Sequence, residues 1–116
     1  MMPAVENDVA MGGAQVVGEL EHPEREAIEL VEVLQALGDP VRLQIVRFLA
    51  DCDGMVACHE IPIPVSKSTG SHHLKVLREA GVVRGKVDGT RKYHTLRRDD
   101  LETRFPGLLD SVLQSV

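Results

Sequence analysis

The sequence contains no tryptophan, one tyrosine and two phenylalanines, so aromatic side chains cannot form most of its core. Hydrophobic residues nevertheless make up 43% of the 116 residues. A chain of this length is expected to fold as one domain. We therefore predict a single core built from leucine, valine and isoleucine.

The chain also has few cysteines and no long apolar run. Two cysteines, Cys52 and Cys58, do not make a disulfide scaffold. No apolar run approaches the ~20 residues of a membrane-spanning helix. Residues 1–13 are acidic and lack the basic and apolar regions of a secretory signal. We expect a reduced, cytoplasmic protein that has no membrane partner.

The net charge of −5 argues against nucleic acid as a partner, but the charges are segregated along the chain. Residues 1–39 contain nine acidic residues and one basic residue, whereas residues 66–98 contain nine basic and two acidic residues. The second segment therefore carries +7, which would suit a polyanion. A solvated charged face is the alternative interpretation of the same composition.

Apolar periodicity predicts a mainly α-helical domain over residues 23–116, after a disordered or flexible acidic tail over residues 1–22. In the first helix, the apolar band is wider than one stripe. Such a helix needs two surfaces to pack on, and a second subunit is a candidate for one of them. The apolar residues of this helix recur at three- and four-residue steps: Ala27, Leu30, Val31, Leu34 and Leu37.

Clear start and stop signals mark the next helices. Asp39 followed by proline predicts a helix over Pro40–Ala50. A short helix near Cys58–Ile61 is limited by the prolines that follow it. Ser66 is suited to cap a longer helix, which should end at Gly81.

The chain then continues as a hairpin and two short helical segments. Val82–Val87 and Arg91–Leu96 are predicted strands, joined by an Asp-Gly pair that is a strong hairpin signal. Helical segments are expected over Arg97–Arg104 and Leu108–Val116. The resulting order of helices followed by a small β-hairpin is that of a winged helix-turn-helix.

The sequence closely resembles the ArsR/SmtB family of bacterial winged-helix repressors in three stretches: LQALGDPVRLQIVRFLA, SHHLKVLREAGVV and DGTRKYHTL. The resemblance covers about Val31–Leu96. It implies a homodimer that binds a double-stranded DNA operator with twofold symmetry and releases it on a chemical signal. It also implies dimerisation through the first and last helices, for which the candidate residues are Ala27, Leu30, Val31, Leu34, Leu109, Val112 and Leu113.

The helix that begins near Ser66 is the candidate reader of DNA. Short side chains in its first turn would let the helix N-terminus lie deep in the major groove, where its free amides favour phosphate. Gly70 fits either a close approach to DNA or close packing on the preceding helix. His73 is expected to be structural. The candidate contacts are Lys67 for phosphate and Ser68, Thr69, Ser71 and His72 for the operator.

The hairpin supplies the second part of the candidate DNA surface. Basic residues at a hairpin tip suit phosphates or a minor groove. Arg42, on the second helix, could bind phosphate or form an internal salt bridge, and the sequence does not choose between them. The hairpin candidates are Lys86, Thr90, Arg91 and Lys92.

The sensor sites that the family resemblance implies are missing. The positions that match the Cys-Val-Cys motif of arsenic-type members are Met55-Val56-Ala57, and no histidine follows His94 to supply a zinc-type site on the last helix. The remaining candidates for a metal or thiol sensor are Cys52, Cys58 and His59. Structural cysteines without reactivity are the alternative. The effector is not identified, and no cofactor is expected.

Two other functional classes are compatible with parts of the pattern. A winged helix can serve as a protein–protein docking module without an operator, although the +7 segment argues against it. An enzyme has little support, because the histidines lack a nucleophile pattern and there is no Gly-rich phosphate loop. We therefore expect a sequence-specific, dimeric transcriptional repressor.

Overall fold

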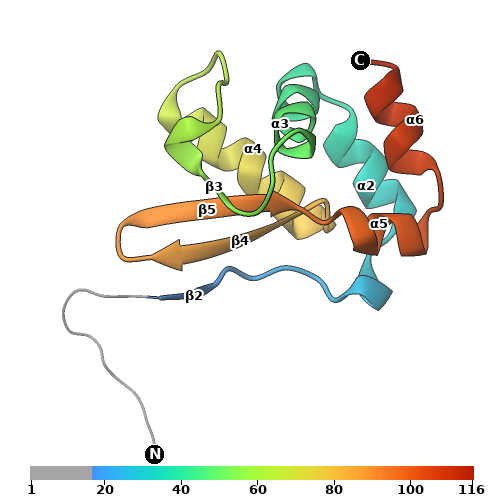
Figure 1. Ribbon diagram of the computed structural model, residues 1–116, viewed down its shortest axis with the longest axis horizontal. Helices are drawn as coiled ribbons and strands as arrows, with labels where there is room; N and C mark the ends of the chain where they lie inside the picture. The colour runs from blue at the N-terminus through green and yellow to red at the C-terminus, as the bar shows by residue number, and fades with distance from the viewer. Residues whose placement is uncertain (1–16) are drawn as a thin grey trace, which may run out of the picture.

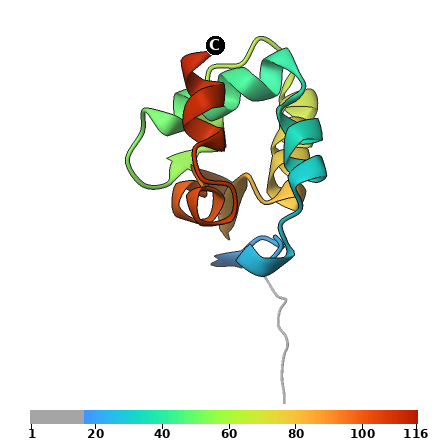
Figure 2. The same ribbon diagram turned by 90° about the vertical axis from the view of Figure 1, so that its right-hand side faces the viewer.

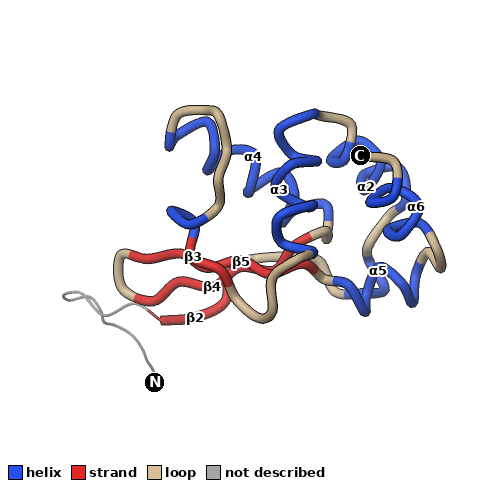
Figure 3. The backbone as a smooth tube through the Cα atoms, turned by 45° about the horizontal axis from the view of Figure 1, so that its top comes forward, coloured by secondary structure: helices blue, strands red, loops and turns tan. Residues whose placement is uncertain are grey.

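The computed structural model describes residues 17–116, which form a layer of helices over one face of a small antiparallel sheet (Figures 1 and 3). Residues 1–16 of the predicted tail over residues 1–22 lie outside the described residues. No helix in residues 17–116 combines the length and the apolar character needed to cross a membrane. The elements are β2 (Val17–Glu19), η2 (Arg25–Ala27), α2 (Leu30–Leu37), α3 (Pro40–Ala50), β3 (Val56–Ala57), η3 (Cys58–Glu60), α4 (Lys67–Ala80), β4 (Val83–Asp88), β5 (Arg91–Leu96), α5 (Arg98–Arg104) and α6 (Leu108–Gln114).

The first predicted helix is shorter than its apolar pattern suggests. Ala27 lies in the 3₁₀ turn η2, and α2 begins only at Leu30. Between them Ile28 has an extended backbone and a fully buried side chain, which packs against Gly81. The chain therefore buries Ile28 in the core instead of continuing as a helix from Ala27 to Leu30.

The start signals of the next two long helices are confirmed. The Asp39 side chain accepts hydrogen bonds from the amides of Val41 and Arg42, at 2.8 and 3.1 Å, and so caps α3. Ser66 caps α4 by accepting from the Thr69 amide at 3.3 Å. At the other end Gly81 adopts a left-handed φ of 92° and terminates α4. These local signals produce the helix pair α3–α4.

The sheet has the strand order β2–β4–β5–β3, and every neighbouring pair is antiparallel. The predicted hairpin is confirmed, but its turn is Gly89-Thr90, because Asp88 still pairs with Arg91. The two outer strands were not predicted. Strands of two and three residues are too short to show a period in the sequence.

β2 corrects the predicted boundary of the acidic tail at residue 22. Gly18 and Glu19 pair with Val87 and Lys86 of β4, so this part of the expected tail belongs to the sheet. The Leu20 amide extends the pairing by donating to the Gly85 carbonyl at 2.9 Å. The ordered domain therefore includes residues before Pro23.

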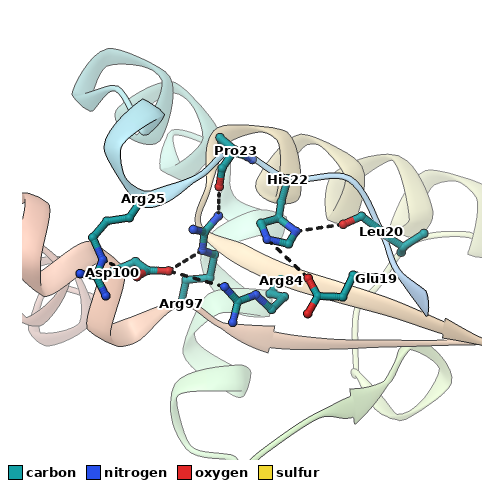
Figure 4. A network of polar contacts seen from close by, with 8 residues as sticks. All are labelled: Glu19, Leu20, His22, Pro23, Arg25, Arg84, Arg97 and Asp100. Carbon is teal, nitrogen blue, oxygen red and sulfur yellow. Dashed lines mark hydrogen bonds and ion pairs between the residues drawn. The ribbon is translucent and has the colours of Figure 1, made fainter. Parts of the chain in front are cut away.

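A polar network holds the segment after β2 against α5 (Figure 4). Asp100 accepts from Nε of Arg25 at 2.7 Å and from Nε of Arg97 at 2.9 Å. Arg97, whose side chain is 2% exposed, also donates to the Pro23 carbonyl at 2.7 Å. One carboxylate thus links the N-terminal segment, the end of the sheet and α5.

The core lies between the helices and the sheet and is aliphatic, as the composition predicts. Its largest fully buried members include Ile28, Ile45, Leu77 and Leu101. The helix pair α3–α4 followed by the β4–β5 hairpin is a winged helix-turn-helix, with the hairpin as the wing. α5 and α6 follow the wing and lie at the same end of the molecule as α2, opposite the wing tip (Figure 1); Figure 2 looks onto that end.

Candidate nucleic-acid interface

The start of α4 and the tip of the wing lie at the same end of the molecule, away from α5 and α6 (Figures 1 and 3). A hollow between α4 and β5 is lined by Ser68, Ser71 and His72 of the helix and by Lys92 of the wing. Helix residues and wing residues therefore border one continuous surface. That arrangement fits a duplex that is contacted by both elements.

The first turn of α4 presents hydroxyl groups to solvent. The Ser66 hydroxyl accepts from the Thr69 amide and donates to the Thr69 hydroxyl at 3.0 Å. Ser68, Thr69 and Ser71 are all exposed, but the Thr69 hydroxyl is engaged by the cap, and the Ser68 hydroxyl lies 3.4 Å from that of Ser66. Their hydroxyl groups can donate to or accept from base edges and phosphates.

The structure favours one of the two explanations for Gly70. A Cβ at this position would lie 2.6 Å from Cδ1 of Ile63, in the turn before α4. Gly70 is also buried. The missing side chain therefore lets the turn pack on the helix, and the glycine is explained without a close approach to DNA.

The wing carries its basic residues on exposed positions. Gly89, with a left-handed φ of 66°, occupies the first position of the two-residue turn. Lys86 lies 5.9 Å from the ring centroid of its cross-strand partner Tyr93. Nine of the ten candidate DNA contacts are exposed: Lys67, Ser68, Thr69, Ser71, His72, Lys86, Thr90, Arg91 and Lys92.

Arg42 is the one candidate DNA contact that is half-buried. Its guanidinium donates to the Ala36 carbonyl at 2.5 Å, and Nη1 lies 3.2 Å from Nδ1 of His73. It therefore satisfies the C-terminus of α2 and links α2 to α4, and it forms no salt bridge with a carboxylate of residues 17–116. His73 is half-buried in this contact, while the neighbouring His72 is exposed.

The candidate dimer residues divide into two groups. Leu30, Val31 and Leu34 of α2 are 43, 64 and 47% exposed, which is unusual for large apolar side chains. Ala27 is exposed in η2, and Val112 and Leu113 of α6 are half-buried. Leu109 is 4% exposed and packs in the core of its own chain, so it is not available for a partner.

The candidate sensor residues do not form one site. No group of three or more His, Cys, Asp or Glu side chains in residues 17–116 is arranged to hold a metal ion. Both cysteines are free thiols. Cys58 contacts Nδ1 of His94 at 3.4 Å, while His59 is exposed and Cys52 lies at a different hollow. The fold therefore does not bring Cys52, Cys58 and His59 together as ligands of one metal. Burial raises the pKa of the Cys58 thiol, which reduces the thiolate needed for a redox switch.

Comparison with known proteins places the same region of the chain in a family. The model of the bacterial regulatory protein, arsR family, matches residues 63–84, which span the start of α4 to the beginning of the wing. An HTH-type transcriptional regulator of Bacillus subtilis, YceK, is 36% identical over 83 residues, which are 70% of this chain and 83% of that protein. The chain belongs to the ArsR family of bacterial regulatory proteins.

A second relative is similar over a shorter stretch of the chain. The HTH-type transcriptional regulator MJ1325 of Methanocaldococcus jannaschii is 36% identical over 69 residues, covering 59% of this chain and 78% of that protein. In the present chain, two of the three positions that match the Cys-Val-Cys motif have a structural role. Val56 and Ala57 are buried and pair with His94 and Tyr93 of β5.

Three residues outside the ten candidate DNA contacts also line the hollow of this ArsR-family protein; of these, the sequence indicates only Arg78, as a solvent or phosphate contact. Lys75 and Arg78 line it from α4, and His94 lines it from β5. His94 is 1% exposed and occupies the space that a side chain on Gly85 would need, since a Cβ there would lie 2.9 Å from Nε2 of His94. The spacing of Lys75 and Arg78 on one helical face was the available signal.

Acidification is expected to destabilise the protein through His94. Burial and the nearby charges of Arg78 and Lys92 lower the pKa of His94 to about 4. The unfolded chain takes up a proton near pH 6.5, so stability falls as the pH drops from about 6.5 to 4, by up to about 3 kcal/mol. Urea unfolding across this range should show the loss in the wild type and a much flatter profile for His94→Gln. Equal slopes in the two proteins would contradict a neutral buried imidazole.

Proposed function

We propose that this protein is a homodimeric, sequence-specific DNA-binding transcriptional repressor that an unidentified signal releases from its operator. The observation that carries the proposal is the joint exposure of the α4 N-terminus and the basic wing at one end of the molecule. The two relatives are HTH-type transcriptional regulators, and the chain matches the arsR family at α4, which supports the same conclusion.

The charges at this surface fit a duplex better than a protein partner. The exposed basic residues of this surface supply phosphate contacts, whose binding energy comes largely from counterion release. These residues are Lys67, Lys86, Arg91 and Lys92. Ser71 and His72 are exposed on α4, where an inserted helix would meet base edges. Two copies related by a twofold axis would place their α4 helices in successive major grooves, about 34 Å apart.

Substitutions on this surface should separate phosphate contacts from base contacts. Lys67→Ala and Arg91→Ala are expected to weaken binding to the operator and to random duplexes by the same factor. Each should reduce the salt slope by about 1.8 per dimer if one phosphate contact is lost per subunit. Ser71→Ala and His72→Ala should weaken binding to the operator by roughly tenfold and leave binding to random duplexes unchanged. Fluorescence anisotropy at several salt concentrations measures both effects.

Arg47→Ala is the matched control for these variants, because Arg47 is exposed on α3 and lines a different groove. It should leave affinity and salt slope unchanged. Unchanged binding by all four test variants would refute the proposal that α4 and the wing bind the duplex. Absent or salt-insensitive DNA binding by the wild type would instead favour a protein–protein docking module.

The exposed apolar residues of α2 are proposed to form the dimer contact together with Ala27, Val112 and Leu113. Val31→Asp should shift the protein to a monomer, raising the dimer dissociation constant by at least about 100-fold, because a twofold interface contains the new charge twice. Sedimentation equilibrium measures the change. Gln44→Asp, at an exposed position of α3, should remain dimeric. A Val31→Asp protein that stays dimeric would place the interface elsewhere.

A further inference from the structure

The hollow between α4 and β5 has a lining with an unusual charge composition. Its volume is about 300 Å³. Three permanent cations line it, together with two imidazoles, two hydroxyl groups, a thiol and one leucine, and no carboxylate is among them. The lining residues are Cys58, Ser68, Ser71, His72, Leu74, Lys75, Arg78, Lys92 and His94.

The cations of this hollow lack ionic partners. Every ion pair within residues 17–116 involves Asp100 or Glu19, so none includes Lys75, Arg78 or Lys92. Lys75 and Arg78 also border a second hollow with Glu21 and Glu79, but neither acid comes within 4.0 Å of them. Positive charge at the α4–β5 hollow is therefore not neutralised by nearby contacts in the described part of the chain.

Arg78 adds an unsatisfied donor. Its Nε is buried and has no hydrogen-bond partner among the described residues. A buried donor without a partner is destabilising, and more so when the group is charged. Within the described residues, the Arg78 guanidinium therefore has one hydrogen-bond partner, His94, and no carboxylate partner.

The floor of the hollow is fixed by His94. Nη1 of Arg78 lies 3.4 Å from Nε2 of His94, and a guanidinium can only donate. Nε2 therefore accepts, and a neutral ring then carries its proton on Nδ1, facing Sγ of Cys58 at 3.4 Å. His94 in this form orients Arg78 without neutralising it.

We propose that this hollow binds a single phosphate-type oxyanion. Arg78, Lys75 and Lys92 supply the charge, and the hydroxyl groups of Ser68 and Ser71 supply further donors. The volume of about 300 Å³ lies at the lower limit for pockets that bind small molecules. The hollow is therefore suited to one phosphate group and not to a larger ligand. The phosphate has two sources, which are a free phosphate compound or a backbone phosphate of bound DNA. The second source rests on the proposed function.

The first arm of the test measures how free phosphate changes the thermal stability of the protein. Thermal unfolding is followed in inorganic phosphate and in chloride at equal ionic strength, with wild type, Arg78→Gln and Arg47→Gln. If the source is free phosphate, saturating phosphate should raise the Tm of the wild type and of Arg47→Gln by at least about 4 °C. Arg78→Gln should show no rise.

The second arm measures the affinity of the same three proteins for random duplex DNA. If the source is the DNA backbone, Arg78→Gln should bind about tenfold more weakly and lose about 1.8 from the salt slope per dimer, while Arg47→Gln matches the wild type. Lys75→Gln carries both arms if Arg78→Gln does not fold, because Lys75 lines the hollow from an exposed position on α4 and is not among the candidate DNA contacts.

The two arms distinguish the anion site from the proposed function. If Lys67→Ala and Arg91→Ala lose DNA affinity while Arg78→Gln and Lys75→Gln match Arg47→Gln in both arms, the anion site is wrong and the DNA-binding function stands. If phosphate raises the Tm through Arg78 but no variant changes DNA affinity, the anion site stands and the function fails.

Discussion

Replacing Asp100 with asparagine is expected to destabilise the protein by about 3 kcal/mol. The Asp100 carboxylate holds Arg25 and Arg97 through hydrogen bonds of 2.7 and 2.9 Å, and Arg97 is almost completely buried. Asparagine keeps one oxygen acceptor but removes the charge, so the Arg97 guanidinium becomes an uncompensated buried cation. The cost of that cation exceeds the modest value of an exposed ion pair.

The stabilisation by Asp100 should also depend on pH. Burial alone would raise the pKa of Asp100, but the hydrogen bonds from Arg25 and Arg97 outweigh it, and the pKa lies below its ordinary value. A lowered folded pKa means that the stabilisation is present above about pH 4, where the unfolded carboxyl is ionised. It is lost as the pH falls through the lower folded pKa. The difference between wild type and Asp100→Asn should therefore shrink at low pH.

Urea unfolding at fixed protein concentration measures this effect, with Asp99→Asn as the control. Asp99 is exposed and forms no ion pair with the described residues. Hydrogen exchange adds a local readout, because the Leu20 amide donates to Gly85 in the segment that Asp100 holds. Its protection should fall in Asp100→Asn only. Equal stability of the two variants would mean that the network does not hold the N-terminal segment.

Replacing Gly81 with alanine is expected to destabilise the protein by about 3 kcal/mol. The left-handed φ of 92° costs a residue with a Cβ about 1–2 kcal/mol. In addition, the new Cβ would lie 2.7 Å from Cγ1 of Ile28, whose side chain is fully buried and cannot move away freely. The two penalties add at the junction of α4, the sheet and the first turn of the domain.

Gly89→Ala separates these two penalties. Gly89 also has a left-handed φ, of 66°, but a Cβ at this position would have no atom within 4 Å of it. Its substitution should cost only about 1 kcal/mol. Thermal and urea unfolding give both values, and the difference between them measures the contact with Ile28. A Gly81→Ala protein no less stable than Gly89→Ala would show that the core yields to the added methyl group.

Local signals allowed much of the fold to be predicted from the sequence. Asp39 and Ser66 act on amides within three residues, and Gly81 acts on its own backbone, so their effects do not depend on distant partners. The late start of α2 could not be predicted, because it follows from the burial of Ile28 against Gly81. β2 escaped prediction for the same reason, since its pairing with β4 joins residues far apart in the chain.

The candidate site was predictable to a similar degree. The exposed positions on α4 and the wing follow from helical and strand periodicity around recognisable turns. The role of Arg42 was not determined, because its acceptor at Ala36 and its neighbour His73 come together only in the folded chain. The same is true of His94, whose contacts with Cys58 and Arg78 span 36 and 16 positions.

Selection of bound sequences from random duplexes, followed by footprinting of the selected site, tests the central claim most directly. A dimeric repressor should enrich a twofold-symmetric site with half-sites about 10 base pairs apart, bound at least about 10³-fold more tightly than random DNA. Footprints should show protection in two successive major grooves. Recovery of no common sequence, with equal affinity for selected and random duplexes, would contradict it.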